Sequence, residues 1–380
     1  MNKTPPVKYF HGLNELRAIA ALCILISHLE QFKWFFGFEQ QLRPQFLIHM
    51  ASMGVTFFFV LSGFLVTYRL LVEKQLHGTI LLKDFFFRRA LRIWPLYLLL
   101  LFISFFLLPH MGFLALTDTS KTLRSVGSWD FGFRFALYLS MMPNIAYVLN
   151  LKVPYLVQSW AIGVEEHFYL FWPGIIKRTK ANLKTFAISF LLVYGFTILA
   201  YMAYKLSLGG SGNTLAKTLK IIFDYMMLGR FTAFIIGGAG AYILHRNKTS
   251  VLRYIRNRPS AILSCILTIT LILLGIKFTP LTNEVYSFLF LMIILNVSAS
   301  NWKIRFLDYL GRISYGIYMY HLLAIGLVGA VIRELSIGSA IYLNIVSYLS
   351  TILVTIILSD LSYRWFESRF IKMKSRYKRI

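Results

Sequence analysis

The chain has 380 residues, of which 57% are hydrophobic and only 14% are charged, a composition that excludes an ordinary soluble domain and is typical of a membrane protein. Its formal net charge is +25 at pH 7. Most of the Lys and Arg residues lie in short segments between apolar runs, so they indicate the cytoplasmic side of a membrane and anionic lipid rather than nucleic acid as a partner.

Apolar runs long enough to cross roughly 30 Å of hydrocarbon recur along the whole chain. We predict straight spans at residues 14–36, 49–71, 90–108, 183–204, 221–244, 260–277, 284–300, 313–332 and 339–363. The segment 133–176 is also apolar, but prolines interrupt it, so we predict one full crossing there plus a half-helix or re-entrant piece. Such backbone is tolerated at membrane depth only where it faces protein or a watery cavity.

The predicted fold is therefore an all-α polytopic membrane protein with about ten transmembrane helices and both termini cytoplasmic. We expect a single domain over residues 1–380, with a basic cytoplasmic tail at 363–380, in a bacterial inner membrane. The first span is long and carries ionisable residues, so it is expected to be retained rather than cleaved as a signal peptide.

That first span contains Arg17 and His28, which are eleven residues apart. A helix turns by about 100° and rises about 1.5 Å per residue, so the two side chains share one face about 16 Å apart. Ionisable groups are costly in hydrocarbon and are usually kept for a function, although a hydrogen-bonded packing histidine is the alternative. Arg17 and His28 are our first candidate catalytic residues.

A basic cluster of Arg88, Arg89 and Arg92 lies at the predicted cytoplasmic end of the third span. An ordinary positive-inside anchor is one interpretation. Arg89 and Arg92, however, share a helix face, and the planar guanidinium matches the geometry of phosphate. If that face points into the bundle, it forms a phosphate site suited to a nucleotide-like or coenzyme donor.

The adjacent carboxylates Glu165 and Glu166 lie in the broken segment and point to different sides of a helix. We expect one to face the cavity and the other a cation, and a structural ion pair and a catalytic role are both open. Three residues are candidates for acceptor binding: Trp160, Arg230 and His321. Arg230 needs a partner or a watery cavity in its apolar span, whereas packing is the favoured interpretation of His321.

The sequence also lacks several catalytic signatures. It has no Walker-type phosphate loop, no His-Glu-x-x-His helix and no Gly-x-Ser-x-Gly elbow, so ATP hydrolysis, zinc proteolysis and serine esterase chemistry lose support. Cys23 and Cys265 both lie in apolar spans, which indicates neither a disulfide framework nor a metal site. We expect no permanently bound cofactor.

Together, these residues resemble the acyltransferase-3 family of integral membrane O-acyltransferases. The matching motifs, in order, are Arg17-x10-His28, the segment 57–65, Arg89-x-x-Arg92, the segment 160–173, the segment 313–321 and the segment 363–367. Ala161, His167 and Arg369 depart from the usual Ser, Gln and Pro, and these departures concern the acceptor more than the reaction. We expect no fused extracytoplasmic esterase-like domain of the kind found in some relatives.

The resemblance implies transfer of an acyl group, usually acetyl, from acyl-CoA as co-substrate to a hydroxyl of a glycan, a lipid-linked saccharide or a small molecule. His28 would act as general base, or would itself carry the acyl group. Burial disfavours imidazolium, so we expect His28 to be neutral. Arg88, Arg89 and Arg92 would hold the coenzyme phosphates, Arg17 would steer the donor or stabilise the oxyanion, and Glu165 or Glu166 would orient His28 or bind the acceptor.

The main alternative is a transporter or flippase of lipid-linked glycan that uses the buried ionisable residues to bind cargo or protons. We detect no paired repeat halves of the kind that many transporters have, which disfavours it. A scaffolding membrane protein is a third possibility, but it would not need several buried ionisable groups. The acyl group, the acceptor and the oligomeric state stay open.

Overall fold

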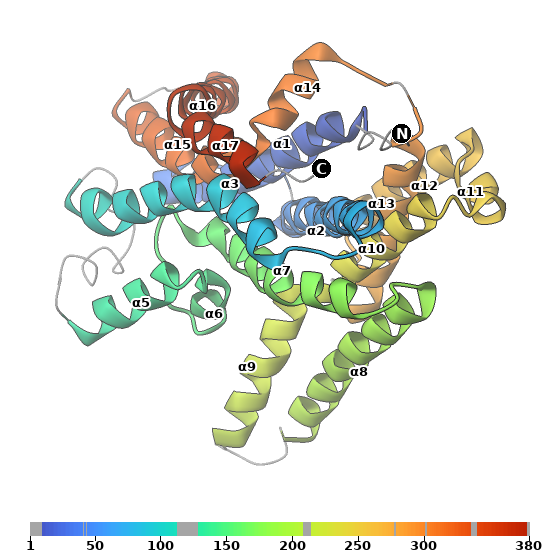
Figure 1. Cartoon of the computed structure of the whole chain (residues 1–380). Coiled ribbons are helices and arrows are strands. Elements are labelled where there is room, and N and C mark those ends of the chain that lie inside the picture. Colours follow the sequence, from blue (N-terminus) through green and yellow to red (C-terminus); the bar gives the residue numbers. More distant parts are fainter. Residues whose placement is uncertain are drawn as a thin grey trace.

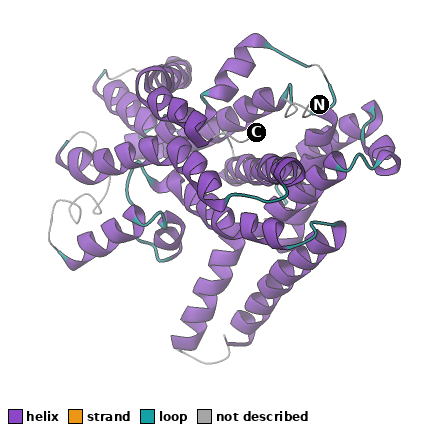
Figure 2. Cartoon of the chain, in the orientation of Figure 1, coloured by secondary structure: helices purple, strands orange, loops and turns teal. Residues whose placement is uncertain are grey.

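The computed structural model describes residues 10–40, 42, 44–111, 128–207, 214–276, 279–300, 302–335 and 340–377. Within these ranges the chain is helical and has no strand, as predicted (Figure 2). The helices are α1 (Leu13–Phe32), α2 (Pro44–His77), α3 (Leu82–Phe102), α5 (Trp129–Leu139), α6 (Pro143–Val148), α7 (Trp160–Arg178), α8 (Leu183–Ser207), α9 (Thr214–Gly229), α10 (Phe231–His245), α11 (Thr249–Ile255), α12 (Arg258–Leu273), α13 (Pro280–Val297), α14 (Arg305–Arg312), α15 (Ser314–Glu334), α16 (Ala340–Leu361) and α17 (Ser368–Met373).

Eight helical stretches in the described residues are long and apolar enough to cross a membrane. They coincide with eight of the predicted spans. The two remaining predicted crossings correspond to α12, which has only 16 residues, and to the broken segment that contains α7. The hydrophobic pattern therefore located all eight of these helices. The prediction of ten crossings exceeds eight because it also counts α12, which is short, and the segment around α7, which is more polar.

Helix α2 lies at the centre of the bundle, between α1, α7 and α10 (Figure 1). Its closest neighbour is α10, and two glycines make that approach possible. A Cβ on Gly63 would lie 2.0 Å from the backbone oxygen of Phe234, and one on Gly237 would lie 2.0 Å from that of Val60. Small residues at such crossings let membrane helices pack backbone to backbone, so this pair forms a rigid centre for the fold.

The segment predicted to be broken does divide into short pieces. Helices α5 and α6 are followed by a single turn at Val157–Ser159 and then by α7. The predicted span 221–244 is broken as well, which the sequence did not indicate: α9 ends at Gly229, and Arg230 adopts a left-handed conformation with φ +43° before α10 begins. Both breaks lie against other helices, as irregular backbone in a membrane bundle requires.

The carboxy-terminal residues also have a defined structure. After α16 the chain makes a π-helical turn at Ser362–Glu367, then α17, then a final 3₁₀ turn at Lys374–Tyr377. This segment packs against α3, where Arg88 donates a 2.7 Å hydrogen bond to the carbonyl of Tyr377 and the ring of Phe87 stacks on that of Tyr377. The described part of the predicted basic tail therefore packs against the helix bundle and does not extend away from it.

Candidate active site

The two candidate histidines contact each other. His28, from α1, and His321, from α15, place Nδ1 and Nε2 2.8 Å apart, with their rings nearly parallel at 8°. His321 is 1% exposed. The residue that the sequence suggested for packing or for acceptor binding therefore lies against the candidate base.

Hydrogen bonding fixes the tautomers of this pair. Nδ1 of His321 is 2.6 Å from the carbonyl oxygen of Tyr318, which can only accept, so Nδ1 of His321 is the donor. In a neutral His321, Nε2 is then an acceptor, so Nδ1 of His28 must carry the proton that it shares. This chain leaves the lone pair of His28 on Nε2, which is the arrangement that a general base requires.

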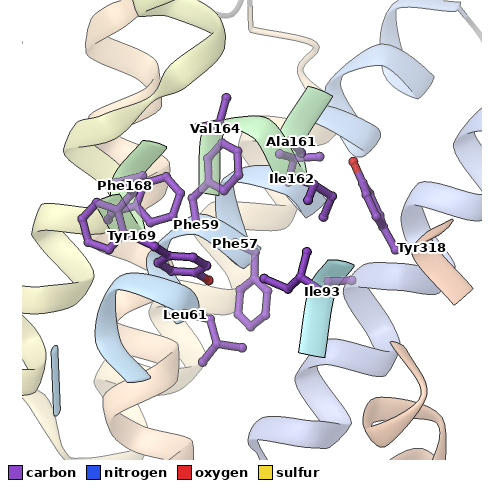
Figure 3. Close-up of a cluster of buried hydrophobic side chains, with 14 of the residues drawn as sticks. Phe57, Phe59, Leu61, Ile93, Ala161, Ile162, Val164, Phe168, Tyr169 and Tyr318 are labelled. Atoms are coloured by element: carbon purple, nitrogen blue, oxygen red, sulfur yellow. The ribbon is translucent and has the colours of Figure 1, made fainter. Parts of the chain in front are cut away.

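Next to the pair is a cavity of about 100 Å³, which we call the inner cavity. It is lined by Arg17, Val55, Phe58, Phe59, Leu61, Ser62, Arg89, Arg92, Ile93, Ala161, Ile162, Glu165, Tyr169, Ser314, Tyr315 and Tyr318. Figure 3 shows how apolar side chains from α2, α3, α7 and α15 converge around this region. Tyr318 joins the cavity to the histidines, because it lines the cavity and its ring centre is 5.8 Å from that of His321.

The adjacent carboxylates have different surroundings. Glu165 lines the inner cavity, where it accepts hydrogen bonds from Ser62 at 2.8 Å and from Tyr169 at 2.9 Å. It makes no ion pair within the described residues. Glu166 instead faces Trp94 of α3 and does not line the cavity. The arrangement therefore favours Glu165 over Glu166 as the carboxylate that meets a ligand.

Arg17 is held from outside the cavity by a short polar chain. Its guanidinium donates to Asn14 at 3.4 Å, and Asn14 donates to Asp308 of α14 at 2.8 Å. Burial raises the pKa of Asp308, but hydrogen bonds from Asn14 and Arg312 outweigh this effect and hold that pKa below its ordinary value. Asp308 thus stays charged and fixes Asn14, which in turn orients Arg17.

A second and larger space adjoins the inner cavity. This basic chamber holds about 670 Å³ and is lined by Arg69, Leu70, Glu73, Phe85, Arg88, Arg89, Arg92, Ile371, Lys372, Lys374 and Ser375. Its volume falls in the roughly 300–1,000 Å³ range of small-molecule sites. Arg89 and Arg92 line both spaces, so they form a neck between the basic chamber and the inner cavity.

The arginines of this site differ in how they are paired. Arg88 is bound to Glu73 at 3.0 Å and to the backbone of Tyr377. Arg89 lies over the ring of Tyr169, 4.9 Å from its centre. In the part of the chain that the structure describes, neither Arg89 nor Arg92 has a carboxylate within ion-pair distance. Unneutralised guanidinium groups that gather around a cavity make an anion site.

The remaining acceptor candidates, Trp160 and Arg230, lie against each other. The guanidinium of Arg230 is 5.9 Å from the ring of Trp160, and it donates to the Ser52 carbonyl at 2.7 Å and to the Thr56 hydroxyl at 2.9 Å. Arg230 thus has the partners that its apolar position demands. Trp160 and Arg230 form an aromatic and cationic patch, and Tyr318, whose ring lies against that of His321, interacts electrostatically with Arg230.

Sequence reasoning missed several residues that line the two spaces. Two of them, Ser62 and Tyr169, could have been found from the sequence. Ser62 lies in the segment 57–65 that resembles a family motif, and Tyr169 follows Glu165 by one helical turn. Arg69, Lys372 and Lys374 resembled ordinary positive-inside anchors. Among the described residues, no group of three or more His, Cys, Asp or Glu side chains could hold a metal ion.

Comparison with known proteins adds an independent line of evidence. A family model for the acyltransferase domain of the acyltransferase-3 family matches residues 10–364. The chain is 25% identical to the peptidoglycan O-acetyltransferase OatA of Listeria monocytogenes, over 95% of this chain and 56% of that protein. It is 28% identical to a Staphylococcus aureus protein that carries the name of an O-acetyltransferase, over 98% of this chain and 60% of that protein.

The chain thus spans little more than half the length of the curated relatives that it matches. No solved structure matches it.

Proposed function

The chain belongs to the acyltransferase-3 family, and from this premise we propose that it is a membrane O-acetyltransferase that uses acetyl-CoA and acylates a carbohydrate hydroxyl. Its apolar helices make it an integral membrane protein. The observation that carries the proposal is that Arg89 and Arg92 line both the basic chamber and the inner cavity, while Tyr318, on the wall of the inner cavity, lies against His321 of the His28–His321 pair.

The basic chamber supports coenzyme A as the donor. Coenzyme A carries phosphates at one end and the reactive thioester at the other. The phosphates match the cationic walls of the chamber, and the smaller inner cavity suits the thioester end of the donor. Arg17 lies on the cavity wall three helical turns from His28, where its guanidinium would steer the anionic donor toward the histidine pair.

His28 then supplies the proton transfer. Its Nε2 lone pair takes the proton of the acceptor hydroxyl as the oxygen attacks the thioester carbonyl. The resulting imidazolium keeps its Nδ1–H bond to His321 and returns the other proton to the departing thiolate. The products are the acetyl ester and free coenzyme A. In the two-step variant, Nε2 attacks the carbonyl itself and expels coenzyme A as its thiolate, which leaves an acyl-histidine. The acceptor hydroxyl then takes the acyl group, frees Nε2 and gives up a proton, which balances the one that the thiolate takes up.

For the acceptor, we propose a sugar hydroxyl. Two relatives are named as peptidoglycan O-acetyltransferases, in Listeria monocytogenes and Bacillus subtilis. Trp160 supports such a ligand, since its ring is only partly buried and an aromatic ring stacks on a sugar face, while Arg230, whose guanidinium already donates to Ser52 and Thr56, lies beside that ring.

The test is transfer by the purified chain in lipid nanodiscs. The chain is incubated with radiolabelled acetyl-CoA and muramyl glycan fragments, and label in the glycan is measured. His28→Ala should lower the rate roughly 10²–10⁴-fold, the usual contribution of a general base. His245→Ala, a partly buried histidine outside both spaces, should leave the rate within twofold.

A folded His28→Ala protein with undiminished transfer would contradict the mechanism. A mass increase of one acetyl group on His28 after brief incubation without acceptor would favour the two-step route. Movement of lipid-linked glycan across vesicles without acetyl transfer would favour the transporter alternative.

A further inference from the structure

The carboxy-terminal segment contributes two lysines to the basic chamber. Lys372 lies in the last turn of α17 and Lys374 begins the final turn, and both side chains line the chamber together with residues of α2 and α3. Neither ammonium group has a hydrogen bond or ion pair within the described residues. The segment is held in place by other groups, namely the Tyr377 carbonyl on Arg88 and the Tyr377 ring on Phe87.

The charge of the chamber is strongly positive. Among the described residues, its lining carries the cations of Arg69, Arg88, Arg89, Arg92, Lys372 and Lys374 and a single carboxylate, that of Glu73. Glu73 is already engaged, since it binds Arg88 at 3.0 Å and accepts from the backbone N–H of Leu81 at 3.0 Å. Once that pair is discounted, the chamber holds more cations than a single diphosphate needs.

The order of groups in the donor assigns these cations to different phosphates, and this step rests on the proposed function. From its thioester outward, coenzyme A presents the pantetheine arm, then the diphosphate, then the ribose 3′-phosphate. With the thioester in the inner cavity, the diphosphate lies near the neck of Arg89 and Arg92. The 3′-phosphate lies farther out, in the part of the chamber that does not adjoin the inner cavity.

We propose that Lys372 and Lys374, together with Arg69, form the subsite for the 3′-phosphate, so that the carboxy-terminal segment makes the enzyme select coenzyme A over donors that lack this group. A phosphate monoester carries a charge near −2 at neutral pH, and lysine meets it as a compact point charge. Arg69 approaches from α2, which places cations on two sides of the same group.

The experiment compares two probes, CoA and 3′-dephospho-CoA, by equilibrium binding to the full chain in nanodiscs of zwitterionic lipid. Without anionic lipid, no added headgroup charge competes for the lysines. The test variant is Lys372→Gln with Lys374→Gln. The control is Arg376→Gln, which removes one charge from the same segment but does not line the chamber.

The wild-type chain should bind CoA roughly tenfold more tightly than 3′-dephospho-CoA, the size of effect expected for charge-assisted contacts in a partly solvated site. The double variant should lose that preference by weakening CoA binding, while its Kd for 3′-dephospho-CoA stays within twofold of the wild type. Arg376→Gln should change neither value. Equal melting temperatures of the ligand-free proteins confirm that the variants fold.

Equal losses for both probes in the double variant, or no loss for either, would overturn the subsite while leaving coenzyme A as the donor. A wild-type chain that binds neither probe would overturn the proposed donor itself. The two failures are therefore distinguished by the wild-type measurement alone.

Discussion

Arg92 and Lys33 are both cations set among apolar helices, but their surroundings differ in kind. Lys33 is 1% exposed and lies 2.6 Å from Glu30, with further contacts to Asn344 at 2.5 Å and to the ring of Tyr348. Arg92 has a cavity on either side and no carboxylate within ion-pair distance in the described residues.

This difference distinguishes cations that are paired within the fold from cations that are available to bind a ligand. A buried charge is tolerable when a partner compensates it, and Lys33 has that partner inside the chain. Arg92 has no such partner in contact, since Glu165 and Glu367 act on it only at longer range, and an anion that enters would complete its compensation. A charge that is paired should therefore matter for stability, and an unpaired one for binding.

The largest expected effect is on stability, at Lys33. Lys33→Met leaves the Glu30 carboxylate buried without its cation, which should cost about 3–5 kcal/mol of unfolding free energy. Thermal unfolding in detergent measures this loss. The double variant Lys33→Met with Glu30→Gln should recover most of it. An unchanged melting temperature in the single variant would show that Lys33 is not a structural cation.

Arg92→Gln should have the opposite profile. Removal of an uncompensated guanidinium should leave the melting temperature unchanged or higher, because no carboxylate loses a partner. The affinity for coenzyme A should fall about 10–100-fold, as expected when a charge-assisted phosphate contact is lost. Parallel unfolding and CoA-binding measurements test this. A large loss of stability with unchanged affinity for coenzyme A would show that Arg92 is a structural cation like Lys33, and the two residues would then not differ in role.

Arg88 is the intermediate case, and its expected effects are the smallest. It lines the basic chamber, yet it is already paired with Glu73, and its side chain is 22% exposed. Arg88→Gln should cost about 1 kcal/mol of stability, in line with other partly exposed ion pairs, and should weaken CoA binding only about threefold. Loss of the Tyr377 contact should also loosen the carboxy-terminal segment, which limited proteolysis would detect as faster cleavage after Arg376.

Much of the fold could be predicted because hydrophobic length marks each long helix independently of the others. The proximity of Arg17 and the Arg89–Arg92 pair to one cavity was also predictable, since shared helix faces and the positive-inside pattern direct them toward one end of the bundle. Their catalytic and binding roles stay predictions until the variants are measured.

Other features depend on contacts between distant segments and leave no local pattern. Glu165 and Glu166 are neighbours on one helix, so only the positions of Ser62 and Trp94 distinguish them. His321 resembled a packing histidine because no residue near it in the sequence indicates that it contacts His28. The lysines of the carboxy-terminal segment resemble any cytoplasmic anchor until Tyr377 is seen to fold back onto α3.

The π-helical turn at Ser362–Glu367 has a consequence for insertions and deletions. A π turn accommodates one residue more than an α turn, and each residue rotates a helix by about 100°. Deletion of a single residue within it would convert the turn to α-helix with about the same total rotation, so Lys372 and Lys374 would stay on the chamber wall, whereas deletion of a residue between Ser368 and Ile371 in α17 would rotate them away from it. In a related sequence, the number of residues between this turn and its basic end is therefore more informative than the identity of the residues between them.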